Sequence, residues 1–173
     1  MSYWTKLIID DVNLSLTHLE PFSFECLARD GAAPAAISVR FNDHCFTKAL
    51  DPEQHSPEDL IRPSYAARTE RRVFCRIRYE LSFRLPDIIR TLGSKRIAST
   101  REGNLVRLEL DNGETYAVFF TLRRKGRDHA DLFVVSAYPL APGKKPADTG
   151  DMKFDLALAK ILRGEKAKFP PRR

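Results

Sequence analysis

The sequence has few of the features that identify secreted or membrane proteins. Its three cysteines, Cys26, Cys45 and Cys75, are an odd number without C-x-x-C spacing, which argues against a disulfide framework and a zinc knuckle. No apolar run approaches the roughly 18 residues that a transmembrane helix requires, and the first residues do not have the pattern of a signal peptide. We therefore expect a cytoplasmic protein with reduced thiols and no membrane contact.

The patterns of several common enzyme classes are also missing. No glycine-rich phosphate loop precedes a helix, no G-x-S-x-G motif occurs, and no group of His, Cys, Asp and Glu has metal-ligand spacing. Cys45 directly follows His44, but a catalytic Cys-His pair is normally assembled by the fold and not by adjacency. We therefore expect no metal, no cofactor and no thiol nucleophile.

Charge is distributed unevenly along the 173 residues, whose net charge is +6. Residues 1–59 hold four Lys/Arg against ten Asp/Glu, a net −6, whereas residues 60–173 hold 25 against 13, a net +12. We interpret 1–59 as an acidic N-terminal β extension with a connector, and 60–173 as a basic domain, both within one compact unit. The basic excess predicts a polyanionic partner. The alternative is that the basic part packs against the acidic part.

The first half of the chain predicts short strands. "YWTKLIID", "FSFECLA" and "AAISVRFND" are rich in aromatic and β-branched residues, as strands are. The following connector predicts at most one short helix, with Ser56 as its N-cap and Pro57 at the first helical position. In "RRVFCRIRYELSFRLPDIIRTLG" the apolar residues first alternate and then take helical spacing, so we predict a strand over 72–79 and a helix over about 83–92.

The second half predicts a sheet and a closing helix. "RIAST", "NLVRLEL", "TYAVFFTLRR" and "DLFVVSAYP" are four strand-like runs joined by polar turns, typical of an antiparallel meander. "MKFDLALAKILRG" has its apolar residues on one helical face and ends at Gly164. The predicted fold class is α+β: a helix followed by a four-stranded antiparallel sheet, with a small N-terminal β extension and a C-terminal helix.

Two hydroxyl residues lie at the end of the last predicted strand. Strict alternation places Ser136 and Tyr138 on one face, together with Leu132 and Val134. A hydroxyl pair beside a cationic strand end provides donors for phosphate oxygens and a cation for the charge that develops during phosphoryl transfer. The alternative is a structural role, in which the strand end is buried and the two hydroxyl groups form hydrogen bonds with neighbouring backbone groups.

A helix followed by four antiparallel strands, the last ending in a hydroxyl residue, a spacer, Tyr and Pro, resembles the barnase/EndoU/colicin/RelE-like ribonuclease superfamily. The similarity covers roughly residues 72–140, with His44 and Thr47 upstream. It implies a metal-independent, toxin-like endoribonuclease that converts an RNA phosphodiester to a cyclic phosphate, with RNA as substrate and a cognate antitoxin or immunity protein as a partner.

The resemblance also implies roles for individual residues. His44 is the candidate acid or base, because imidazole changes protonation near neutrality. Arg78 and Arg123 are candidates for stabilising phosphate charge, and Ser136 and Tyr138 for contacting phosphate or base. Further substrate contacts are expected from Thr47, Thr121, Arg124 and Lys125. No clear second histidine accompanies His44, so the acid/base pair is left open.

A non-catalytic module remains the rival interpretation. A module that binds nucleic acid or an acidic protein needs only the spread of basic residues. In that case His44 is a turn residue after a strand, and the basic run at 123–127 is a solvated hairpin tip. A nuclease requires His44, Ser136 and Tyr138 to converge on one phosphate-sized cleft.

Overall fold

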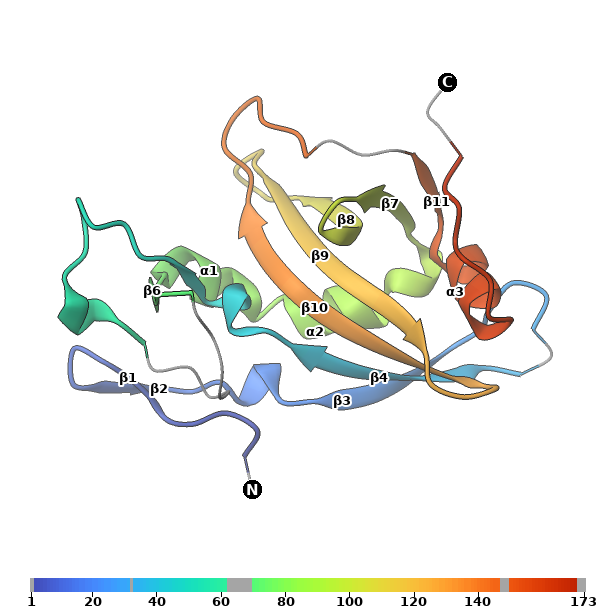
Figure 1. Ribbon diagram of the computed structural model, residues 1–173, viewed down its shortest axis with the longest axis horizontal. Helices are drawn as coiled ribbons and strands as arrows, with labels where there is room; N and C mark the ends of the chain where they lie inside the picture. The colour runs from blue at the N-terminus through green and yellow to red at the C-terminus, as the bar shows by residue number, and fades with distance from the viewer. Residues whose placement is uncertain (1, 32, 62–69, 147–149, 171–173) are drawn as a thin grey trace.

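The protein is built on one large mixed sheet, seen in a computed structural model that describes residues 2–31, 33–61, 70–146 and 150–170 (Figure 1). The sheet has seven strands in the order β11-β7-β8-β9-β10-β4-β3. All neighbouring strands are antiparallel except β4 and β10, which are parallel. Their bounds are β3 Phe22–Cys26, β4 Ala35–Phe41, β7 Arg96–Thr100, β8 Gly103–Glu109, β9 Thr115–Arg124, β10 His129–Pro139 and β11 Asp151–Lys153.

Smaller elements surround this sheet. Two short antiparallel ribbons pair β1 (Leu7–Ile9) with β2 (Val12–Leu14) and β5 (Thr47–Ala49) with β6 (Arg72–Phe74). Among the described residues, the helices are α1 (Arg76–Ser82), α2 (Leu85–Arg90) and α3 (Phe154–Leu162), and the 3-10 turns are η1 (Thr17–Leu19), η2 (Asp43–Cys45), η3 (Pro57–Asp59) and η4 (Leu92–Ser94). Within the described residues, none of the helices is long and apolar enough to span a bilayer.

The predicted fold class is wrong. The four predicted strands do form an antiparallel meander, β7 to β10, but they are four strands of a seven-stranded mixed sheet. The segments assigned to an N-terminal extension supply β3 and β4, and β4 pairs with β10 from Ala36 opposite His129 to Phe41 opposite Val134. Nothing in a local pattern distinguishes a strand that joins a distant sheet from one that forms its own hairpin, so the extension was misplaced.

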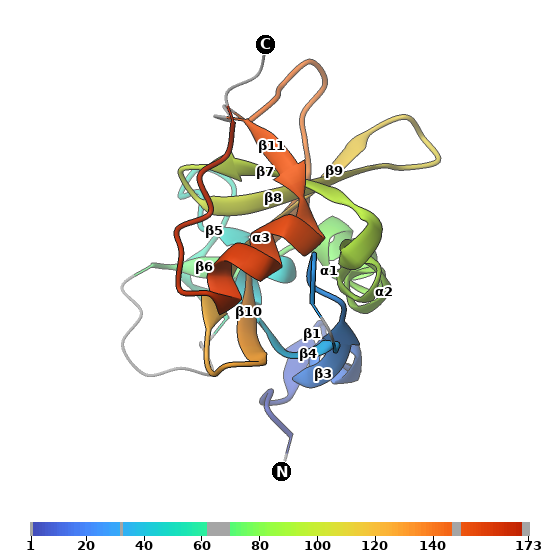
Figure 2. The ribbon, with the colours of Figure 1, turned by 90° about the vertical axis from the view of Figure 1, so that its right-hand side faces the viewer.

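The two faces of the sheet are covered differently. On the core face, Tyr116, Val118 and Phe120 of β9 are buried in the main core together with residues of α1, α2 and α3. In Figure 1 the helix α2 lies behind β10 and α1 lies to the left of the end of β10, and Figure 2 shows α3 in front of the strands. The outer face holds a smaller apolar cluster, against which Tyr138 and Leu140 pack; its buried members are Ala98, Leu105, Ala117 and Phe119.

The segment predicted as a strand over 72–79 followed by a helix over 83–92 is built otherwise. The strand β6 ends at Phe74, and the alternating residues after it form α1. A second helix, α2, starts at Leu85 with Pro86 in its first turn, where proline removes no helical hydrogen bond. Alternation misled here because Tyr79 and Ser82 of α1 are buried at i, i+3 helical spacing within the same run.

A β-bulge changes the face that the end of β10 presents. Val134 pairs with Phe120 on the core face, but the next paired residue, Ser136, lies opposite Phe119, so Val135 is the extra residue. Ser136 and Tyr138 therefore share a face, as predicted, but it is the outer face and not that of Leu132 and Val134. The bulge brings the Tyr138 ring into stacking contact with Phe119, with 5.4 Å between ring centres and 22° between planes.

The β7–β8 hairpin depends on Gly103. This residue has a φ of +123°, and a Cβ atom there would lie 2.8 Å from the carbonyl oxygen of Phe120. Gly113, in the β8–β9 turn, also has a positive φ, of +80°, but a Cβ there would meet nothing within 4 Å. The two glycines thus separate backbone strain from steric collision.

We predict that Gly103→Ala lowers the free energy of unfolding by at least about 2 kcal/mol, since strain and collision combine. Gly113→Ala introduces strain alone and should cost about 1 kcal/mol. Urea denaturation of the two variants beside the wild type measures both values. Equal losses would show that the close approach to Phe120 has no energetic consequence.

His18 fixes η1 against α1. Its ring stacks on Phe83 with 3.8 Å between ring centres, and its Nε2 lies 2.7 Å from the hydroxyl of Ser82. The buried Nδ1 has no hydrogen-bond partner among the described residues. Burial lowers the pKa of His18 from 6.5 to about 4, because the charged imidazolium loses hydration there.

This pKa predicts a loss of stability in mild acid. The unfolded chain takes up the proton near pH 6.5, whereas the folded protein resists it until about pH 4, so the stabilisation is present above pH 6.5 and is lost as pH falls toward 4. His18→Gln should flatten the dependence of melting temperature on pH across this window. His55→Gln is the matched control for removing a histidine. An unchanged slope in His18→Gln would contradict this role.

Candidate functional site

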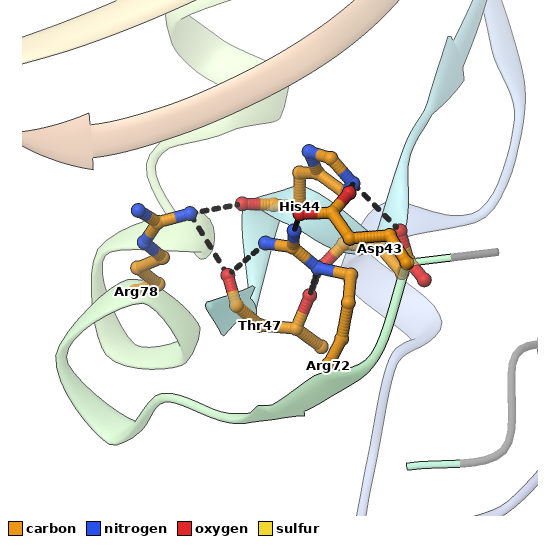
Figure 3. A network of polar contacts seen from close by, with 6 residues as sticks. Asp43, His44, Thr47, Arg72 and Arg78 are labelled. Carbon is orange, nitrogen blue, oxygen red and sulfur yellow. Dashed lines mark hydrogen bonds and ion pairs between the residues drawn. The ribbon is translucent and has the colours of Figure 1, made fainter. Parts of the chain in front are cut away.

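A polar cluster forms where β4 ends. The amide of Asn42 donates to the carbonyl of Val134 (2.9 Å), and the chain then turns through η2. The turn is held by Cys45, whose side chain is fully buried, and by the hydroxyl of Thr47, which donates to the carbonyl of Asp43 (2.8 Å). The turn thus leaves the sheet with Asp43 and His44 at fixed positions. We call Asp43, His44, Thr47, Glu70, Arg72 and Arg78 the His44 cluster (Figure 3).

Arg72 is the buried centre of this cluster. Strand β6 brings it in opposite Ala49 of β5, and the residue is only 6% exposed. Its Nε donates to the hydroxyl of Thr47 (2.6 Å), its Nη2 to the carbonyl of Thr47 (2.9 Å) and its Nη1 to a carboxylate oxygen of Glu70 (2.7 Å). Burial lowers the pKa of Arg72, an effect that the neighbouring Glu70 and Asp43 oppose. Hydrogen bonds donated by all three guanidinium nitrogens therefore stabilise the buried charge of Arg72.

Arg78 links the cluster to the last strand of the meander. Its Nη1 donates to the carbonyl of Thr47 (2.8 Å) and to that of His44 (3.2 Å). Its guanidinium carbon lies 4.8 Å from the centre of the Tyr138 ring, within cation-π range. Because Arg72 and Arg78 both donate to the Thr47 carbonyl, two positive charges are held close together beside His44 (Figure 3).

Glu70 orients the imidazole of His44. One carboxylate oxygen of Glu70 binds Arg72, and the other lies 3.2 Å from Nε2 of His44. A carboxylate oxygen of Asp43 is 3.9 Å from the same nitrogen. The His44 side chain is 24% exposed. A carboxylate that holds one imidazole nitrogen sets the ring orientation, as the acidic member of a catalytic triad does.

This arrangement has the parts required for proton transfer on an anionic substrate. An oriented, partly exposed imidazole can accept or donate a proton near neutral pH. The guanidinium of Arg78 supplies positive charge on the side of Tyr138. Burial raises the pKa of Tyr138, so its phenol remains a proton and hydrogen-bond donor.

The structure brings together four of the residues singled out from sequence. His44, Thr47, Arg78 and Tyr138 are joined through the guanidinium of Arg78. Ser136 lies two residues before Tyr138 on the same face, but it is buried and only 5% exposed. Thr47 has no exposed surface, so its role is to hold the two arginines and not to contact a substrate.

The remaining basic candidates lie at the other end of the sheet. Arg123 pairs with Asp131 and Arg124 with Ala130, near the start of β10, whereas Tyr138 is close to its end. At the rise per residue of a strand, this separation is roughly 20 Å. Lys125 forms an ion pair with Asp131 (3.5 Å), and Thr121 lies between the two ends, opposite Phe133. These four residues therefore do not belong to the His44 cluster.

Three members of the His44 cluster were not predicted from the sequence: Asp43, Glu70 and Arg72. Asp43 resembled a turn former, and Glu70 follows a polar connector. Arg72 alternates with Val73 as an outward-facing strand residue would, yet it is buried because the carbonyl and hydroxyl of Thr47 receive it. A charged residue directly before the apolar pair Val73 and Phe74 was the available signal, but its partner Thr47 is 25 residues away in the sequence.

Thiol and metal chemistry find no support in the described ranges. Burial raises the pKa of the Cys45 thiol well above its ordinary value, which disfavours the reactive thiolate. Across the same part of the chain, no group of three or more His, Cys, Asp and Glu side chains is placed to hold a metal ion.

Comparison with known proteins identifies the family of this chain. A family model described as the YjaZ family matches residues 6–162, which is most of the chain. The chain belongs to the YjaZ family. No curated protein and no solved structure gave a match. The match extends from β1 through α3, so in this YjaZ family member the whole sheet and the His44 cluster lie within the matched region.

We predict that Arg72→Lys lowers the free energy of unfolding by about 2 kcal/mol or more, because an ammonium cannot reproduce three directed hydrogen bonds in a buried site. Arg71→Lys, at the exposed neighbouring position, is the matched control and should stay within about 0.5 kcal/mol of the wild type. Urea denaturation measures both. An equal effect at both positions would show that the buried network does not stabilise the fold.

Proposed function

We propose that the protein is a metal-independent, toxin-like endoribonuclease whose acid/base residue is His44. The observation that carries the proposal is the Glu70–His44 pair on a residue whose backbone carbonyl binds the guanidinium of Arg78. A carboxylate-oriented imidazole in the same cluster as a guanidinium suits proton transfer at a phosphate. The net charge of +12 on residues 60–173 supports a polyanionic substrate.

The proposed reaction is an intramolecular transesterification. His44 takes the proton of a ribose 2′-hydroxyl, and the 2′-oxygen forms a bond to the adjacent phosphorus. The bond from phosphorus to the 5′-oxygen of the next nucleotide breaks, leaving a 2′,3′-cyclic phosphate, and the phenol of Tyr138 donates a proton to the departing oxygen. Arg78 offsets the negative charge that builds on the phosphate.

The basic residues at the far end of the sheet receive a different role. Arg123, Arg124 and Lys125 lie roughly 20 Å from Tyr138 along the strands, too far to touch the same phosphate. In the proposal they contact the RNA backbone several nucleotides away from the cleaved bond, and so contribute affinity and not rate. The proposal also includes a cytoplasmic location and a cognate antitoxin or immunity protein that restrains the enzyme.

Binding without cleavage is the second candidate function. It is favoured by one observation: Arg72 and Arg78 both donate to backbone carbonyls, which is what residues that only dock β5 and α1 would do. In that case the basic surface binds nucleic acid or an acidic protein, and His44 is a structural residue.

The test is incubation of the purified protein with end-labelled tRNA and mRNA in EDTA. His44→Ala should reduce the rate of cleavage by at least about 100-fold, and Tyr138→Phe should also reduce it, because each removes a group that moves a proton. His55→Ala, which changes a histidine outside the cluster, should keep the wild-type rate. The cleaved strands should end in a cyclic phosphate.

Two results would overturn this proposal. Cleavage that persists in His44→Ala excludes the assigned acid/base residue. Intact RNA that nevertheless shifts on a native gel excludes the nuclease and favours the binding module.

A further inference from the structure

A groove opens on the outer face of the sheet, beside Tyr138. It has a volume of about 540 Å³, within the range of small-molecule sites. It lies between the β7–β8 turn and the segment 140–146 that follows β10, the loop at the top of Figure 1. Its lining includes Arg101, Glu102, Phe119, Tyr138, Lys144 and Lys145.

The floor of the groove is flat and apolar. The stacked rings of Phe119 and Tyr138 form its base, and Leu140 packs against the same outer-face cluster. Phe119 is almost fully buried, whereas Tyr138 and Leu140 keep part of their surface accessible. Phe119 stacks on the Tyr138 ring and Arg78 lies over it, so the groove meets this ring at its edge. A planar aromatic ligand packs there in the edge-to-face contact that aromatic pairs also favour.

The rim carries positive charge that the described part of the chain leaves uncompensated. Arg101, Lys144 and Lys145 are exposed, and none of them forms an ion pair or side-chain hydrogen bond there. Glu102 is the one carboxylate among the lining residues, so their formal charge is +2. Cations beside an apolar floor suit an anion attached to an apolar body.

Two polar groups lie at the edge of the floor. Glu102 has a carboxylate that can accept hydrogen bonds from the N–H groups of a base, and Thr100 has a hydroxyl that donates to the carbonyl of Gly103 (2.9 Å). A fatty acid would leave the Glu102 carboxylate beside a hydrocarbon chain. A nucleobase has a ring that packs against the apolar floor and N–H groups that donate to the Glu102 carboxylate.

We propose that this groove binds one nucleotide, with the base on the Phe119–Tyr138 floor and the phosphate at Lys144 and Lys145. The inference rests on the proposed function only in treating that nucleotide as a unit of RNA. Arg78 lies over the Tyr138 ring and binds the His44 carbonyl, so a nucleotide in the groove is adjacent to the His44 cluster. The groove is then the substrate-positioning part of the site.

Calorimetric titration of the full-length protein with AMP, GMP, CMP and UMP tests this proposal. At least one mononucleotide should bind, and the double variant Lys144→Gln, Lys145→Gln should weaken that binding at least tenfold. The double variant Lys166→Gln, Lys168→Gln removes the same charge from exposed positions outside the groove and should leave it unchanged. The matching nucleoside and ribose 5-phosphate should each bind at least tenfold more weakly, because one lacks the phosphate and the other the base.

The outcomes separate the groove from the catalytic proposal. Mononucleotide binding that survives in His44→Ala supports the groove even if no RNA is cleaved, because His44 does not line it. The proposal is overturned if no mononucleotide binds at millimolar concentration, if both double variants weaken binding equally, or if ribose 5-phosphate binds as tightly as the nucleotide. Cleavage that depends on His44 together with any of these results would leave the nuclease standing and remove the groove from it.

Discussion

The parallel pairing of β4 with β10 determines where everything else in the candidate site lies. The two strands run side by side from Ala36 and His129 to Phe41 and Val134, and both point toward the same edge of the sheet. Strand β4 ends there, and the amide of Asn42, the next residue, donates a hydrogen bond to Val134 of β10. Strand β10 continues to Pro139. Its edge beyond Val134 would expose unpaired backbone groups, and η2 and α1 cover it instead.

The covering of that edge explains the composition of the His44 cluster. A turn that leaves the sheet exposes carbonyl groups that no strand satisfies, and the carbonyls of His44 and Thr47 are of this kind. Guanidinium groups satisfy several carbonyls at once, so Arg72 and Arg78 serve where neutral donors would be too few. Their charge requires carboxylates close by, and Glu70 meets that requirement while it also holds His44. Structural and chemical roles therefore coincide in the same side chains.

Local patterns predicted the parts of the fold whose contacts are local. The runs at 96–100 and 115–124 became β7 and β9 because sequential antiparallel strands need only their own alternation and a turn between them. The helix α3 was visible for the same reason. The position of β4 was not, since its partner β10 is about 90 residues further along the chain. Arg72 was missed likewise: its burial depends on Thr47, which no periodicity around residue 72 reveals.

The bulge at Val135 connects the cluster to the outer-face groove. Without the extra residue, Tyr138 would fall on the core face, where Tyr116 and Val118 already fill the space, and the outer face would end at Phe119. With it, the Tyr138 ring lies between two environments, stacked on Phe119 of the groove floor and approached by Arg78 of the cluster. A ligand that contacts this ring would also change the surroundings of the Arg78 guanidinium, which donates a hydrogen bond to the backbone carbonyl of His44. The one-residue bulge in β10 thus gives the groove and the His44 cluster a common boundary, formed by Tyr138 and Arg78.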